Sequence, residues 1–266
     1  MEKLSKLGRI FYGIAIAGLG LGAIYYNEFP YMLCPPIHLA KPILAIFTYA
    51  VGTFLFLAGG CIVFQKRAGL FSLLLGSGLL LTVCCCYIPY ELVNHSNFGE
   101  WENAEKDLAL CGGAFLIAGC FMEHYEDLVT RISKKLVSLG RIFFLIPIFI
   151  FGIDHFLFTK EAATLVPSWI TYHIFWTYFA GAALIGSAIA LMFKIETGII
   201  AFLMGTMIFL WFILLHVPRV VISPVADRGD EVTSAFLALA YSGIAFVIAG
   251  AEKKYNLKQM KKPLLG

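Results

Sequence analysis

The chain has 266 residues, of which 60% are hydrophobic and only 14% are charged. Ordinary globular proteins carry about 25% charged residues, and a water-soluble core cannot absorb so large an apolar excess. The formal net charge is +3, which is too small to favour a nucleic-acid-binding protein. The composition therefore excludes a soluble globular domain and indicates an integral membrane protein with no nucleic-acid partner.

The apolar residues gather into eight runs, each near the roughly 20 residues that a helix needs to cross a bilayer. Backbone polar groups in lipid must be bonded within their own segment, so the runs are predicted to be helices and the fold all-α. The predicted spans are 9–26, 42–64, 69–92, 107–123, 140–158, 170–193, 198–217 and 234–251.

Basic residues predict the orientation, because positively charged loops stay on the cytoplasmic side. Fifteen Lys and Arg residues fall on the side of the N-terminus. The other side has five, namely Lys41, Lys106, Lys160, Arg219 and Arg228. Both termini are therefore predicted to be cytoplasmic.

An internal repeat divides the spans into two sets of four. Leu7–Phe11 recurs without change at 139–143, an offset of 132 residues. Further identities follow at offsets of 129 and then 131: Gly52 with Gly181, Gly76 with Gly205, Pro89 with Pro218, and Gly112 with Gly243. Each half holds an even number of spans, so the two copies are predicted to share one orientation.

The repeat also bears on the first span, whose basic start resembles a signal peptide. Because this segment has a counterpart deep inside the chain, retention is favoured over cleavage. The predicted domains are a first four-helix repeat at 1–122, a cytoplasmic linker at 123–138, a second four-helix repeat at 139–251, and a basic cytoplasmic tail at 252–266.

Ionisable residues inside membrane spans are costly and usually mark functional positions. Asp154 and His155 lie about 12 residues into the fifth span, beyond the middle of the bilayer. Other polar and aromatic residues lie near the outer ends of the sixth and seventh spans, where the first half has other side chains. An outward-facing pocket is therefore predicted in the second half, formed by Asp154, His155, Trp169, His173, Trp176, His216 and Arg219.

Structural roles are the alternative for these residues. Tryptophans are common at the membrane interface, and a long basic side chain such as Arg219 can extend from a helix end toward water. The segment with Glu91, His95, Glu100, Trp101, Glu102, Glu105 and Asp107 is predicted to be a solvated acidic loop.

All seven cysteines belong to the first half, and no Cys-x-x-Cys pair is present. Cys34 and Cys86 are the candidates for a pair of redox thiols on the oxidising side. Packing is the favoured role for most of the others, because a free cysteine behaves as a small hydrophobe. Histidine and aspartate are standard metal ligands, but their spacing here matches no metal signature, so no metal is predicted.

Several short motifs of the second half resemble the DoxX-like family of four-helix bacterial membrane proteins. They are Gly152–Phe156, Val166–Trp169, Trp176, Gly181 and His216–Pro218. The resemblance implies the bacterial cytoplasmic (inner) membrane, and a subunit of a quinol-linked oxidoreductase or a partner of thiol-redox proteins. It carries over His155, Pro167, Trp169 and Trp176 as pattern positions without defining their roles.

Two functions remain open from the sequence. In the first, the outer pocket binds a quinone between Trp169 and Trp176, while His155 or His173 exchanges its proton. No haem, flavin or iron–sulfur signature is present, so electrons would come from a thiol pair or from a membrane or periplasmic partner protein. In the second, the protein is a non-enzymatic subunit that binds or transports a lipid or isoprenoid, or assembles a partner complex.

Overall fold

The computed structural model describes residues 2–27, 35, 40–94, 98–121, 128–224 and 228–260, and all regular structure in this part of the chain is helical. The first half contains α1 (Glu2–Tyr26), α2 (Lys41–Val63), α3 (Ala68–Thr82), the π-helical segment η1 (Val83–Tyr87), α4 (Ile88–Asn94) and α5 (Phe98–Gly119). The second half contains α6 (Leu128–Leu157), α7 (Thr159–Leu165), α8 (His173–Met192), α9 (Thr197–Trp211), the π-helical segment η2 (Phe212–His216), α10 (Val217–Ile222) and α11 (Arg228–Met260).

Seven helical segments of the described residues are long and apolar enough to cross a membrane. They are Glu2–Tyr26, Lys41–Val63, Ala68–Val93, Lys135–Leu157, His173–Met192, Thr197–Ile222 and Arg228–Ala251. The prediction of an all-α protein with several membrane-spanning helices is confirmed. The predicted fourth span lies in α5, whose first half carries several charged residues, and α5 is not among the seven. Eight spans therefore stay a prediction.

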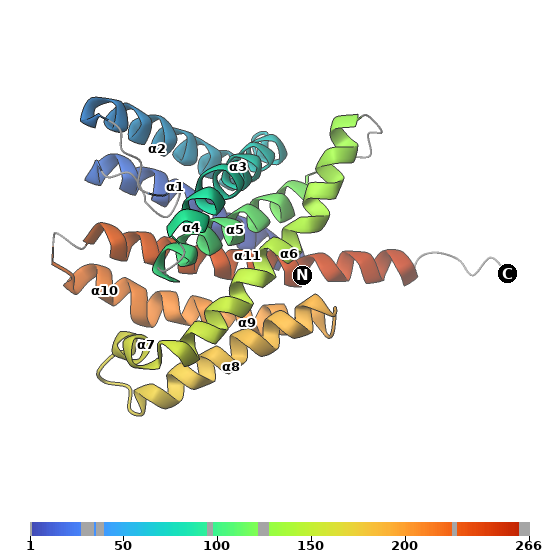
Figure 1. Ribbon diagram of the computed structural model, residues 1–266. Coiled ribbons are helices and arrows are strands. Elements are labelled where there is room, and N and C mark those ends of the chain that lie inside the picture. The colour runs from blue at the N-terminus through green and yellow to red at the C-terminus, as the bar shows by residue number, and fades with distance from the viewer. Residues whose placement is uncertain are drawn as a thin grey trace.

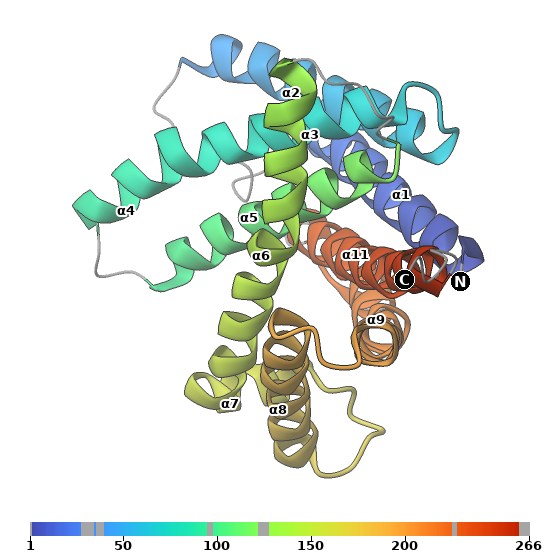
Figure 2. The same cartoon turned by 90° about the vertical axis from the view of Figure 1, so that its right-hand side faces the viewer.

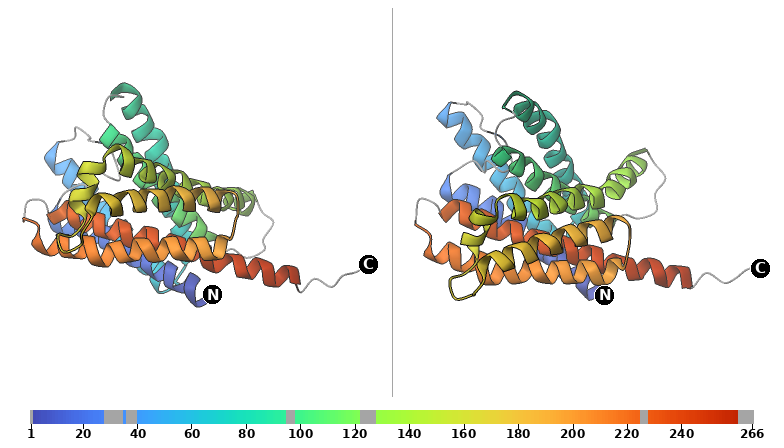
Figure 3. Two further views of the ribbon diagram at one scale, coloured as in Figure 1. Left: turned by 90° about the horizontal axis from the view of Figure 1, so that it is seen from below. Right: turned by 60° about the horizontal axis from the view of Figure 1, so that its bottom comes forward.

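The helices form a closed circuit in which each span packs on the next one along the chain. From α1 the contacts run through α2, α3, α5, α6, α8 and α9 to α11, which returns to α1. Figure 1 shows α11 between α1 and α9, and its C-terminal end projects beyond the other helices (Figures 1 and 3). Helices α5 and α11 also contact each other and lie near the centre of the view in Figure 2. The core is therefore built around the last helix of each half.

Glycines set the distance between the helices at two crossings. A Cβ atom on Gly243 of α11 would lie 2.6 Å from the carbonyl oxygen of Gly8 on α1. A Cβ atom on Gly112 of α5 would lie 2.5 Å from the carbonyl oxygen of Gly140 on α6. Lipid provides no hydrophobic drive for helix association, so close backbone packing of this kind holds membrane helices together. The two crossings occupy positions that match in the internal repeat.

The π-helical segments η1 and η2 also fall at matched positions. In each, a backbone N–H bonds five residues back: Ile88 N–H to the Val83 oxygen, and Val217 N–H to the Phe212 oxygen. Pro89 and Pro218 follow directly, and a proline has no N–H for the carbonyl four residues earlier. The wider turn accommodates this missing hydrogen bond within a continuous helix.

Two arginines hold one end of the bundle together. The Arg9 guanidinium lies 4.9 Å from the centre of the Phe121 ring, so it joins α1 to the turn that follows α5. Arg141 donates to the Leu191 carbonyl oxygen at 2.5 Å and to the Thr197 hydroxyl oxygen at 3.1 Å. These contacts place the N-terminal part of α1, the middle of α6 and the start of α9 at the end of the bundle where α5 and α8 finish.

We expect Gly243→Ala to destabilise the protein by about 1–3 kcal/mol, because the new methyl group meets the backbone of α1, which cannot move without separating the helices. Thermal unfolding in detergent, followed by circular dichroism, measures the change. Gly186→Ala is the matched control, since a Cβ at Gly186 on α8 meets nothing within 4 Å. Equal melting temperatures for the two variants would contradict this role of the crossing.

Candidate functional site

His155 is directed from α6 toward α9. Its Nδ1 lies 2.7 Å from the Phe151 carbonyl oxygen, and its ring stacks on Trp211 with centroids 5.9 Å apart. A carbonyl oxygen only accepts hydrogen bonds, so Nδ1 carries the proton of the neutral ring and Nε2 is the nitrogen with a lone pair. Trp211, which the predicted pocket omitted, is thus the aromatic partner of this histidine.

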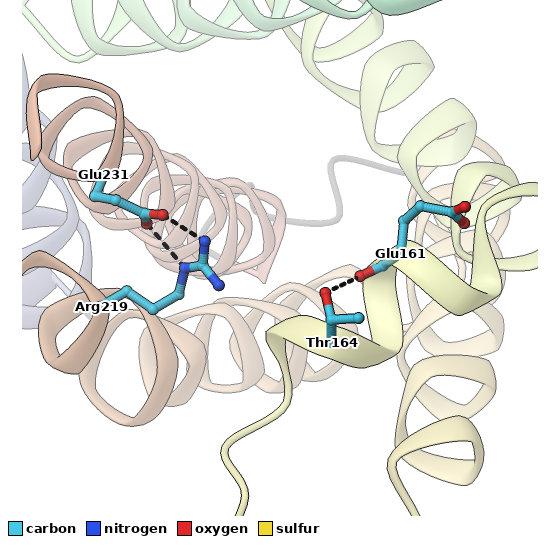
Figure 4. A network of polar contacts seen from close by, with 4 residues as sticks. All are labelled: Glu161, Thr164, Arg219 and Glu231. Atoms are coloured by element: carbon cyan, nitrogen blue, oxygen red, sulfur yellow. Dashed lines mark hydrogen bonds and ion pairs between the residues drawn. The ribbon is translucent and has the colours of Figure 1, made fainter. Parts of the chain in front are cut away.

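His216 and Arg219 lie together on η2 and α10, with a partner that the predicted pocket also omitted. The Arg219 guanidinium makes two hydrogen bonds to the Glu231 carboxylate on α11, from Nε to Oε2 at 2.9 Å and from a terminal nitrogen to Oε1 (Figure 4). The charges of Glu231 and Arg219 both act on the half-buried His216 ring. This ion pair joins α10 to the start of α11.

Trp169, His173 and Trp176 are placed differently from the other predicted pocket residues. The side chains of Trp169 and Trp176 are 68% and 44% exposed. Trp176 packs edge-on against Phe175 and Phe179, which are themselves exposed. His173 is half-buried and begins α8. Trp176 therefore belongs to an exposed aromatic surface of α8, and Trp169 lies exposed in the turn before this helix.

Asp154 interacts with charged residues of α5. The charges of Glu102 and Lys106 act on its carboxyl group, whereas His155, one residue on, faces α9. Adjacent helical residues point about 100° apart, so α6 presents a carboxyl group to one neighbour and an imidazole to the other at nearly the same depth.

The prediction of a solvated acidic loop is wrong for Glu91 and Asp107. Both lie in helices, and both side chains are completely buried. The signal was present in the helical period: Asp107 precedes Cys111 by four residues and Ala114 by seven, so all three share the buried face of α5. The charged residues around Asp107 in the sequence led to the prediction of a solvated loop instead.

Three carboxyl groups, Glu102, Glu105 and Asp154, form what we call the outer carboxylate cluster. Glu102 is exposed and forms an ion pair with Lys106 at 2.7 Å, whereas Glu105 and Asp154 are half-buried. Burial, followed by the charge of Asp154, raises the pKa of Glu105 to about 7, although Lys106 opposes the shift. Glu105 precedes the predicted span at 107–123, at the end of the bundle that the distribution of basic residues predicts to face outer water.

The matching interface between α1 and α11 shows what packing alone requires. There Phe236 fills the space over Gly18, and Val232 is the nearest side chain to a Cβ at Gly22. In the repeat, Glu105 occupies the position of Phe236, and Asp154 that of Gly22. The interface between α1 and α11 is therefore filled by apolar groups, whereas the interface between α5 and α6 carries two carboxyl groups. Packing does not require these carboxyl groups.

The thiol and metal predictions have separate outcomes. Cys34 lies outside the described residues, so its pairing with Cys86 is not tested. Cys86 is a half-buried free thiol in η1, beside the exposed Cys84 and Cys85. Across the described residues, no group of three or more His, Cys, Asp or Glu side chains could hold a metal ion.

Comparisons of the chain with protein-family models, with curated proteins and with solved structures find no match. The similarity to the DoxX-like family therefore stays a prediction from short motifs. The candidate site depends on the geometry of α5, α6, α9 and α11.

We expect the pKa of Glu105 to make stability depend on pH. Its usual value of 4.5 is raised to about 7 in the fold, so the folded state holds the proton more tightly. Stability should thus fall as the pH rises from about 4.5 to about 7 and level off above that range. Melting temperatures across this range should decline less for Glu105→Gln than for wild type. Equal slopes of melting temperature against pH in the wild type and Glu105→Gln would show that Glu105 titrates normally. The matched control is Glu102→Gln, because Glu102 is exposed.

Proposed function

We propose that the chain crosses the membrane eight times, as two parallel copies of a four-helix unit with both termini in the cytoplasm. The paired glycine crossings and the two π-helical segments at matched positions support this arrangement. The arginines at one end of the bundle support the same orientation for both halves. On this arrangement α5 provides the fourth span, and its charged first turns face the outer side.

A fluorescent protein and an alkaline phosphatase, each fused after Gly266, test the orientation. The fluorescent fusion should fold in the cytoplasm and the phosphatase fusion should be inactive, because the phosphatase matures only in an oxidising compartment. An active phosphatase fusion with a dark fluorescent fusion would place the C-terminus outside.

For the function, we propose a proton-exchanging component of the bacterial cytoplasmic membrane that binds the ring of a quinone at its outer end. The observation that carries this proposal is the arrangement on α6 of His155, stacked on Trp211, beside Asp154 of the outer carboxylate cluster. An aromatic wall and a histidine nitrogen suit a flat ring with a hydroxyl or carbonyl group.

In this proposal, the side chains of the site only accept a proton or pass it on. His155 Nε2 accepts a proton from a quinol hydroxyl, because Nδ1 already donates to the Phe151 oxygen. Glu105 and Asp154 exchange that proton with outer water through the exposed Glu102. The chain has no haem, flavin or iron–sulfur motif, so on this proposal a membrane or periplasmic partner protein, of the kind associated with DoxX-like subunits, supplies or removes the electrons.

A second function is supported by the exposed aromatic residues of α8. Phe175, Trp176 and Phe179 form a surface at the level of the lipid interface, which suits a lipid or isoprenoid chain held from the side. In that case the protein is a non-enzymatic binding, transport or assembly subunit, and Trp176 contributes more to binding than Trp211.

A titration of the protein in nanodiscs with a short-chain quinone separates the two functions. Tryptophan fluorescence should be quenched on binding, and His155→Ala should weaken binding about tenfold, the effect of losing one hydrogen bond of roughly 1.4 kcal/mol. Trp211→Phe should remove most of the quenching, while Trp176→Phe, the matched control, should keep the affinity. Unchanged quinone affinity in both His155→Ala and Trp211→Phe would contradict the quinone site. Binding of an isoprenoid that depends on Trp176 would favour the second function.

A further inference from the structure

Asp107 is a fully buried carboxylate in the interior of the bundle. Its side chain has no exposed surface, and neither carboxylate oxygen has a hydrogen-bond partner among the described residues. Burying an ionised carboxylate without a partner costs several kcal/mol. The position therefore favours a carboxyl group that carries its proton.

No described cationic side chain balances Asp107. The titratable groups whose charges interact with it are Tyr12 on α1, Cys111 on α5 and Tyr241 on α11. Among the other elements packed against α5, α3 has no titratable side chain. The titratable residues of the remaining elements are Cys84, Cys85, Cys86 and Tyr87 on η1, Tyr90 and Glu91 on α4, and Asp154 and His155 on the outer half of α6. Lys106, the neighbouring cation, forms its ion pair with Glu102.

Tyr241 connects this interior group with the outer carboxylate cluster. Its hydroxyl interacts electrostatically with Asp107 and also with Glu102 and Glu105. It donates a hydrogen bond to the Lys106 carbonyl oxygen at 3.4 Å, which is long for an O–H donor. A hydroxyl held so weakly can rotate between acceptors, whereas Tyr12 is held at 2.7 Å by the Leu110 oxygen.

The second half offers no counterpart to this arrangement. In the repeat, the positions of Asp107 and Tyr241 correspond to Ala238 and Leu110. The polar pair therefore forms once, from one residue of each half, where α5 and α11 meet at the centre of the bundle.

We propose that Asp107 is an interior proton-binding site that is loaded from the outer carboxylate cluster through the hydroxyl of Tyr241. In the transfer, the Tyr241 oxygen accepts a proton from Glu105 as its own proton passes to Asp107, so the tyrosine is unchanged overall. Proton entry through Glu105 rests on the function proposed above, whereas the protonation of Asp107 does not.

Infrared spectroscopy of the protein in nanodiscs at neutral pH tests this proposal. The wild type should show a carboxylic-acid C=O band that moves when aspartate is labelled with carbon-13 at its carboxyl group. The band should be lost in the nearly isosteric Asp107→Asn. It should persist in Asp154→Asn, the matched control. The assignment would be overturned if the band persisted in Asp107→Asn, or if no carboxylic-acid band of the wild type moved on labelling. The labelling experiment does not depend on the folding of a variant.

The route is tested by transfer into heavy water. The band should shift as the proton exchanges, and the shift should be several-fold slower in Tyr241→Phe, while Tyr12→Phe, the control, should exchange at the wild-type rate. Equal rates in wild type and Tyr241→Phe would overturn the route. The quinone titration is a separate readout: Asp107→Asn should bind quinone normally, so failure of the interior site and failure of the quinone site are distinguishable.

Discussion

The backbone contact between helices of opposite halves is the constraint on which the rest of the structure depends. At Gly8 with Gly243, and at Gly112 with Gly140, the backbones of two helices approach so closely that a single methyl group would meet a carbonyl oxygen. In lipid such contacts replace the hydrophobic effect as the source of helix association. They make the first helix of each half pack on the last helix of the other, so neither half completes its packing alone.

This exchange of partners creates two interfaces with the same geometry and different contents. Between α1 and α11, the space near the C-terminal end of α1 is closed by Phe236 over Gly18. Between α5 and α6 the corresponding end holds Glu105 and Asp154. The interface between α1 and α11 packs without carboxyl groups at the matching positions. Packing therefore does not require the carboxyl groups between α5 and α6. An ionisable residue within a span, such as Asp154, generally has a functional reason.

Burial of the carboxyl groups increases along α5 from its N-terminal part toward the centre of the helix. Glu102 is exposed and paired, Glu105 is half-buried, and Asp107 is completely enclosed. Each step inward makes the charged form of a carboxyl group less favourable, because the surroundings solvate it less. A series of this kind suits the movement of protons better than the binding of a fixed charge, and the hydroxyl of Tyr241 lies beside it.

The sequence alone was sufficient for the membrane class, the all-helical fold and seven helices long and apolar enough to cross a membrane, since length and apolarity decide these in lipid. It also indicated His155, His216 and Arg219 as polar groups near the outer end. Tertiary structure decided their partners, because Trp211 and Glu231 lie on other helices and no local pattern links them. It also decided that Asp107 is buried: its neighbours in sequence are charged, and only the packing of α5 against α3, α6 and α11 removes it from water.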